Sequence, residues 1–199
     1  MQKICTNPFQ AVPHREGLED TTTKEVSGIR LHKNYIWLVA AVLVGLFGGA
    51  AMLLAVSHAD KTMKYHYRKD MSCPHVVDYE PETGAMRKYD WNNGSDDTAH
   101  STWSRGQSWG LYGFTMMYRE TGDRKYLQHA EKIADFLLSH PNMPEDMIPY
   151  WDYSAPERSK MRDASAAAVM ASALMELSTY SARGKKYFEA GEKQLKSLS

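Results

Sequence analysis

An internal repeat is the feature that most restricts how this chain can fold. Residues 124–127 (RKYL) recur as 185–188 (KKYF), and 131–132 (EK) recur as 192–193, at the same offset of 61 residues. In each copy the apolar residues are spaced three and four apart, which predicts an amphipathic helix. Self-similarity at a fixed period is the mark of stacked supersecondary units.

A helix of different character precedes each copy. Residues 105–120 are rich in glycine and aromatic residues, and residues 162–177 contain six alanines, with Asp163 as the expected N-cap. Asp123 is the expected N-cap of the first amphipathic helix. Small residues let helices approach closely, and the amphipathic helix then covers them. The pattern predicts an all-α fold of repeated helical hairpins, either an open solenoid or a closed α/α toroid.

An apolar stretch precedes the repeats. Tyr35 to Val56 contains 22 residues without a charge, which is long enough to span a bilayer. The alternatives are a secretory signal peptide, with Ser57 and Ala59 at the cleavage site, a buried core helix, or an artefact of the gene model. Lysine and arginine are balanced on its two flanks, so they predict no membrane orientation. Residues 1–34 lack apolar periodicity, and we expect a disordered lead there.

Charge and cysteine content exclude several classes of function. Lys+Arg and Asp+Glu are both 24, so the net charge is zero, and no basic patch with interleaved aromatic residues argues for nucleic acid. The two cysteines, Cys5 and Cys73, form no C-x-x-C pair and no disulfide framework. Asp96-Asp97 lacks further ligands and is typical of a solvated turn. We therefore predict no metal, no cofactor and no nucleic-acid partner.

Two segments between the predicted helices are candidates for a site. Met71 to Thr102 is long and irregular, as functional loops often are. It leads into a helix start where Arg105 and Trp109, spaced i and i+4, share one face. A guanidinium beside an indole suits an anionic sugar, whose ring stacks on the indole while its carboxylate takes the guanidinium fork. The alternative is core packing around a buried ion pair.

Pro149–Tyr153 is a second aromatic cluster, which either walls a sugar cleft or plugs one end of the array. Asp152 within it is either an acid with a raised pKa or a solvated loop residue. His75 either positions a carboxylate partner or supports its loop. Asp163 is better explained as a helix cap than as a catalyst.

Four motifs in order carry a family resemblance. Residues 101–114 (STWSRGQSWGLYGF) resemble the hallmark of glycoside hydrolase family 88, the unsaturated glucuronyl hydrolases. Residues 75–79 (HVVDY), 148–153 (IPYWDY) and 162–168 (RDASAAA) agree with it. The likeness runs from about residue 55 to the C-terminus. The related unsaturated rhamnogalacturonyl hydrolases usually show RGNGW where this chain has RGQSW, which favours the glucuronyl branch.

The resemblance implies that residues 57–199 form part of an (α/α)6 toroid, preceded by the apolar helix at 35–56. It implies a lyase-derived oligosaccharide as partner, with a 4,5-unsaturated uronic acid at its non-reducing end. The family protonates the vinyl ether and adds water at C5, and the resulting hemiketal opens. By resemblance the substrate-binding residues are Arg105, Trp109, His75, Gln107 and Trp103.

The same resemblance places the family's two catalytic aspartates before His75, the second of them near residues 30–34, where the sequence has no Asp. The catalytic residues are therefore unassigned, and we expect this chain to lack them and to hold an incomplete toroid. The competing interpretation is a non-catalytic, membrane-tethered helical module that binds acidic sugars. Family members commonly act in the periplasm, so we expect an extracytoplasmic, periplasmic or membrane-anchored location.

Overall fold

The computed structural model describes residues 33–90, 101–154 and 161–199. In these ranges the chain forms helices α1 (Lys33–Tyr65), α2 (Ser104–Thr121), α3 (Arg124–Ser139), α4 (Ala164–Ser178) and α5 (Gly184–Leu198), and strands β1 (Val76–Tyr79) and β2 (Met86–Asp90). Most of the predicted lead at 1–34 lies outside the described residues, although its last two residues begin α1. The predicted Asp96-Asp97 turn also lies outside them.

The chain divides into two units between Gly45 and Leu46, and helix α1 crosses this boundary. Its large apolar side chains are exposed, and Phe47 is 73% accessible. From Trp37 onward α1 is long and apolar enough to cross a membrane, and no other helix in the described ranges is. The helix predicted at 35–56 is therefore confirmed, and it continues as far as Tyr65.

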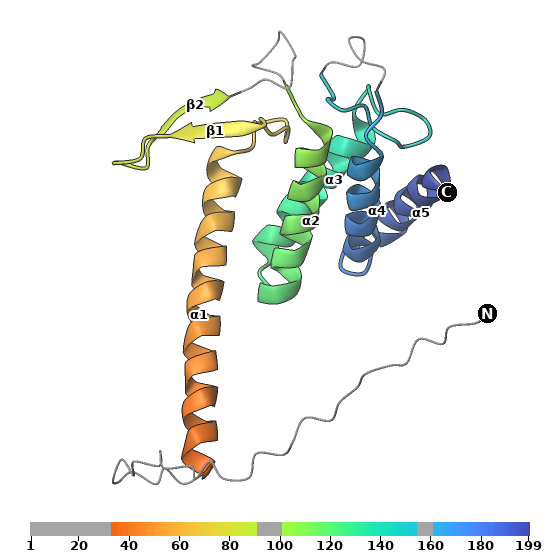
Figure 1. Ribbon diagram of the computed structural model, residues 1–199. Coiled ribbons are helices and arrows are strands. Elements are labelled where there is room, and N and C mark those ends of the chain that lie inside the picture. The colour runs from red at the N-terminus through yellow and green to blue at the C-terminus, as the bar shows by residue number, and fades with distance from the viewer. Residues whose placement is uncertain (1–32, 91–100, 155–160) are drawn as a thin grey trace, which may run out of the picture. The chain divides into compact units, whose positions relative to one another are not determined.

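Two helical hairpins form the core of the second unit. Helices α2 and α4 pack side by side as an inner pair, while α3 packs on α2 and α5 packs on α4 (Figure 1). Leu111, Ile133 and Leu174 are completely buried between these helices. The all-α prediction is thus confirmed, with the small-residue helices inside and the amphipathic helices outside.

The repeated RKYL-like motif ties each outer helix to the one before it. Tyr126 Oη donates to Asp60 Oδ1 at 2.9 Å, and Tyr187 Oη donates to Asp135 Oδ1 at 3.3 Å. The lysine before each tyrosine pairs with the same aspartate. The C-terminal end of α1 therefore contacts α3 in the same way as α3 contacts α5. This end of α1 has the position of an outer helix.

The segment after α1 is more regular than we predicted. Strands β1 and β2 pair antiparallel, with Val77 opposite Tyr89, so the prediction of an irregular Met71–Thr102 was wrong in this part. Gly84 closes the connection with a positive φ of 68°, which glycine adopts at little cost. The β-branched and tyrosine residues of the strands favour this pairing. The repeat pattern did not predict it, because that pattern covers only the helices.

Tyr67 connects the end of α1 to α2. Its ring packs edge-on against Phe114 and His129, at centroid distances of 5.8 and 4.5 Å. A Cβ atom on Gly110 would overlap the Tyr67 hydroxyl, so glycine is what allows this close approach. Burial raises the pKa of Tyr67 well above its usual value.

Candidate functional site

A bridging segment, Pro149–Tyr153, holds the N-termini of the two inner helices at the same end of the hairpins. On one side the Ser104 amide donates to the Trp151 carbonyl at 3.0 Å, just where α2 begins. On the other side the Asp163 amide donates to the Pro149 carbonyl at 2.8 Å, just before α4 begins. The residues that open both inner helices are thereby placed together, although they are about 60 positions apart in sequence.

Asp152 lies at the centre of this segment and is completely buried. Its carboxylate accepts hydrogen bonds from the Ser101 hydroxyl at 2.7 Å, from the Thr102 amide at 3.0 Å and from the Ser154 amide at 2.8 Å. These three hydrogen bonds replace the ones that the carboxylate loses with water when it is buried. The prediction of a solvated loop residue was therefore wrong, while the alternative, an acid, stays a prediction.

Arg105 and Asp163 join the two inner helices through one ion pair. Arg105 Nε donates to Asp163 Oδ2 at 3.1 Å, and Nη2 lies 3.0 Å from the same oxygen. Asp163 Oδ1 accepts the Ala166 amide at 2.8 Å and caps α4 as predicted. Asp163 is 5% exposed and Arg105 is 44% exposed, so the arginine reaches solvent. No hydrogen bond joins its Nη1 to another described residue.

The aromatic ring beside this guanidinium is that of Trp103. Arg105 Cζ lies 5.5 Å from the ring centroid of Trp103, and the His75 ring meets the same indole at 4.8 Å. A Cβ atom on Gly106 would lie 3.1 Å from Trp103 Cε3, so the indole rests on the helix backbone there. The structure thus brings together three of the residues singled out from sequence: His75, Trp103 and Arg105.

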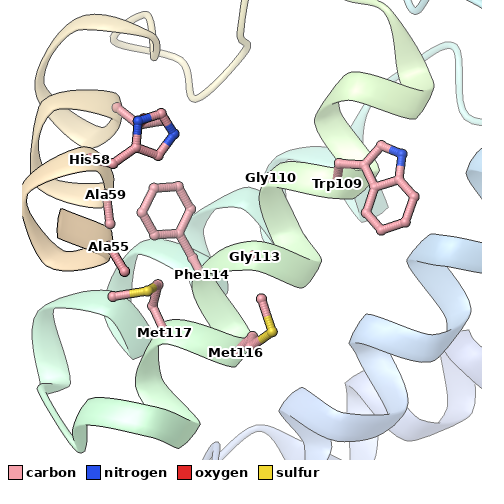
Figure 2. Close-up of a pocket in the computed structure, with 10 residues that line it drawn as sticks. Ala55, His58, Ala59, Trp109, Gly110, Gly113, Phe114, Met116 and Met117 are labelled. Atoms are coloured by element: carbon pink, nitrogen blue, oxygen red, sulfur yellow. The ribbon is translucent and has the colours of Figure 1, made fainter. Parts of the chain in front are cut away.

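Trp109 lies one turn further along α2 and is 54% exposed, on the same face as Arg105. It meets Tyr112 edge-on at 6.0 Å. It also borders an apolar pocket of about 280 Å³ to which Ala55 and Phe114 contribute. Figure 2 shows the Trp109 indole extending away from Phe114, so most of its surface is available outside that pocket.

Gln107 faces the opposite way and is completely buried. Its Oε1 accepts the Cys73 amide at 2.9 Å, and its Nε2 donates to the Met71 carbonyl at 2.6 Å. Gln107 therefore holds the turn that leads to His75. A substrate contact through Gln107 stays a prediction, and the structure shows it as a support for the residues that reach solvent.

Cys73 lies next to these residues but is a poor candidate for a catalyst. Burial raises the pKa of the Cys73 thiol to about 12, despite the charge of Arg68, so the thiol is protonated at neutral pH and is a poor nucleophile. Arg162 lies over the Tyr150 ring at 5.1 Å and donates to the Ile148 carbonyl at 2.7 Å. Within residues 33–90, 101–154 and 161–199, no three His, Cys, Asp or Glu side chains gather as metal ligands.

Sequence comparison with known proteins extends over most of the chain. The chain is 44% identical over 147 residues to an unsaturated glucuronyl hydrolase of Formosa agariphila. The aligned region covers 73% of this chain and 36% of the relative. The chain is 37% identical over 127 residues to an unsaturated glucuronyl hydrolase of Bacillus sp. strain GL1, covering 63% of this chain and 33% of that one. No family model matches the chain.

Solved structures agree with these relatives. A crystal structure of an unsaturated glucuronyl hydrolase specific for heparin matches with a TM-score of 0.67 and 50% identity, over 71% of this chain and 38% of that chain. A variant of the Streptococcus agalactiae enzyme, complexed with dGlcA-GalNAc6S, matches with a TM-score of 0.52 and 30% identity. It covers 66% of this chain and 35% of that one.

The paired hairpins, with the inner helices α2 and α4 packed side by side, form part of an α/α toroid, the fold of these relatives. Within that class the chain belongs to the unsaturated glucuronyl hydrolases, glycoside hydrolase family 88. It spans about a third of the length of the curated relatives it matches.

Sequence reasoning missed the second role of Asp163. The residue was recognised as a cap from its place before the alanine-rich helix. Its pairing with Arg105 had no sequence signal, because the two residues lie 58 positions apart and meet only when the inner helices pack.

Proposed function

We propose that this chain takes part in hydrolysing oligosaccharides that end in a 4,5-unsaturated uronic acid, and that its described part recognises the acidic sugar. The observation that carries this proposal is Arg105, half-exposed, beside Trp103 and held at the N-terminal end of the inner helices. The relatives named above as unsaturated glucuronyl hydrolases support the same substrate class.

The hydrogen bonds of Arg105 define how a sugar carboxylate would bind. Asp163 occupies the edge of the guanidinium formed by Nε and Nη2. The end formed by Nη1 and Nη2 keeps its outward N–H groups, and this end matches the two oxygens of a carboxylate. The N-terminus of α2 adds the positive end of the helix dipole. Trp103 or Trp109 then offers an indole face to the sugar ring.

The reaction that fits this substrate is hydration of the vinyl ether. A proton is added at C4 and water at C5, and the hemiketal then opens with loss of the glycosidic bond. In this scheme Arg105 binds and orients the uronic acid. Asp152 and Asp163 are both engaged in structural hydrogen bonds, so neither is assigned as the proton donor.

Replacement of Arg105 tests the proposal. An unsaturated chondroitin disaccharide is titrated into the full chain in detergent micelles, and hydrolysis is followed as loss of ultraviolet absorbance. Arg105→Ala should weaken binding at least about tenfold, because a charge-assisted, two-bond contact contributes about 1.5–3 kcal/mol. Arg119→Ala is the matched control, since Arg119 lies at the other end of α2 and pairs with Glu176 at 3.0 Å.

Equal affinities for Arg105→Ala and the wild type would refute the carboxylate contact. Binding without any loss of absorbance would instead favour the non-catalytic, membrane-tethered module that binds acidic sugars.

For location, we propose that α1 anchors the chain in a membrane, with the helical hairpins outside the cytoplasm. The support is the apolar window of α1, which has a mean hydropathy of 2.5 and is 0% buried. We expect the wild type to stay in the membrane pellet after alkaline extraction. A variant with Leu43→Arg and Phe47→Arg should be released, because charges at the centre of a span cost about 2.5–3.5 kcal/mol each. Release of the wild type would refute the anchor.

A further inference from the structure

We infer that Asp163 is a positioning residue for the acidic sugar: it fixes the guanidinium of Arg105 so that only the Nη1–Nη2 end faces the ligand. This inference rests on the proposed function, because it assigns a role to a residue that acts through Arg105.

The two oxygens of Asp163 have separate tasks. Oδ1 accepts the Ala166 amide at 2.8 Å and fixes the carboxylate to the first turn of α4. Oδ2 accepts a hydrogen bond from Arg105 Nε at 3.1 Å and lies 3.0 Å from Arg105 Nη2. Since the amide bond sets the position of the carboxylate, the carboxylate in turn sets the plane of the guanidinium.

Burial makes this arrangement directional. Asp163 is 5% exposed whereas Arg105 is 44% exposed. The carboxylate is therefore held inside the protein, and the guanidinium that it orients lies at the surface. The Trp103 indole, 5.5 Å from Arg105 Cζ, limits the guanidinium on a second side. An arginine held on two sides has already lost the rotamer freedom that binding would otherwise remove.

A second capping aspartate in the same chain shows that capping alone does not require this contact. Asp123 caps α3 by accepting the Lys125 amide at 3.0 Å, and its carboxylate pairs with Lys125 of the same helix. Asp163 instead reaches from the start of one inner helix to a charged residue on the other. Asp123 is therefore a matched control for any effect that follows from capping only.

The test compares Asp163→Asn with Asp123→Asn in the full chain in detergent micelles. Asparagine is as good an N-cap as aspartate, so the helix is retained while the charged acceptor is lost. Binding of an unsaturated chondroitin disaccharide and of its methyl ester is measured at 1 M salt. Salt at this concentration screens charges through solvent over about 3 Å. Loss of the negative charge of Asp163 would by itself strengthen binding of the acid, so weaker binding reports the loss of positioning.

We expect Asp163→Asn to weaken binding of the acid about fivefold, the range expected for immobilising one arginine side chain, and to leave the ester unchanged. In an Arg105→Ala background the same substitution should have no effect. The Nε–H signal of Arg105 in nuclear magnetic resonance spectra should change from ordered to mobile in Asp163→Asn, and stay ordered in Asp123→Asn.

An Arg105 signal that stays ordered in Asp163→Asn would overturn the inference, as would equal weakening of acid and ester. If the wild type binds neither sugar, the proposed function fails, and so does the role in sugar binding. The Nε–H signal then still shows whether Asp163 orders Arg105.

Discussion

Replacement of Asp152 by alanine should destabilise the end of the hairpins on which the candidate site lies. The Asp152 carboxylate is completely buried and receives the Ser101 hydroxyl and the Thr102 amide, both from residues at most 2% exposed. In the alanine variant these two donors lose this acceptor while they stay buried. The third donor, the Ser154 amide, belongs to an exposed residue and can turn to water.

The size of the effect follows from these contacts. A buried donor without an acceptor costs about 1–3 kcal/mol, so two of them reduce the free energy of unfolding by about 4 kcal/mol. Asp152→Asn keeps one carbonyl oxygen as acceptor and should lose about half as much. With a urea dependence of about 2 kcal/mol per molar, the alanine variant should unfold at a urea concentration lower by about 2 M.

Urea unfolding followed by tryptophan fluorescence measures this directly, because Trp103 and Trp151 lie next to the affected contacts. Asp123→Ala is the control, since it removes one exposed cap and should cost about 1 kcal/mol. A midpoint for Asp152→Ala equal to that of Asp123→Ala would refute the reasoning. If Asp152→Ala does not fold at all, Asp152→Asn and the control still give the order of stabilities.

Three further predictions concern single residues. Gly113→Ala has open space around its new methyl group and should stabilise the chain by up to about 1 kcal/mol. In Gly110→Ala the methyl group overlaps the Tyr67 hydroxyl, so thermal unfolding should show this variant to be about 1–3 kcal/mol less stable than Gly113→Ala. Burial, helped by the charge of Lys132, lowers the pKa of His129 to about 4 from 6.5. Protonation therefore favours the unfolded chain, so stability is full above pH 6.5 and about 2 kcal/mol lower at pH 5, and His129→Leu should remove this part of the pH dependence. Cys73 should react with iodoacetamide at pH 7.5 at least tenfold more slowly than a free thiol, and equal rates would contradict its raised pKa.

Local periodicity predicted the helices well because each one has its own signal. The amphipathic spacing of α3 and α5 indicated that they are helices, and the capping residues Asp123 and Asp163 marked where α3 and α4 begin. The β1–β2 hairpin was missed because its strands are only four and five residues long, which is too short for a clear alternation. Asp152 was misjudged because burial depends on segments that lie 50 residues away in sequence.

At the candidate site, too, local spacing predicted some features and contacts between distant segments decided the others. The i, i+4 spacing placed Arg105 and Trp109 on one face, and the structure has both exposed there. The choice of Trp103 as the ring beside Arg105 depended on how the indole lies against Gly106. The burial of Gln107 depended on the turn at Met71 to Cys73, which the repeat pattern does not describe.

By itself, the sequence determined that this protein is an array of helical hairpins, and its motifs identified the family, because both signals reside in short contiguous stretches. The tertiary structure alone decided which side chains of those motifs reach solvent and which support them. Asp152 and Gln107 are buried and hold neighbouring segments by hydrogen bonds, whereas Arg105 is the exposed member of an ion pair. These contacts join distant segments, so they form only after the inner helices pack and water is excluded between them.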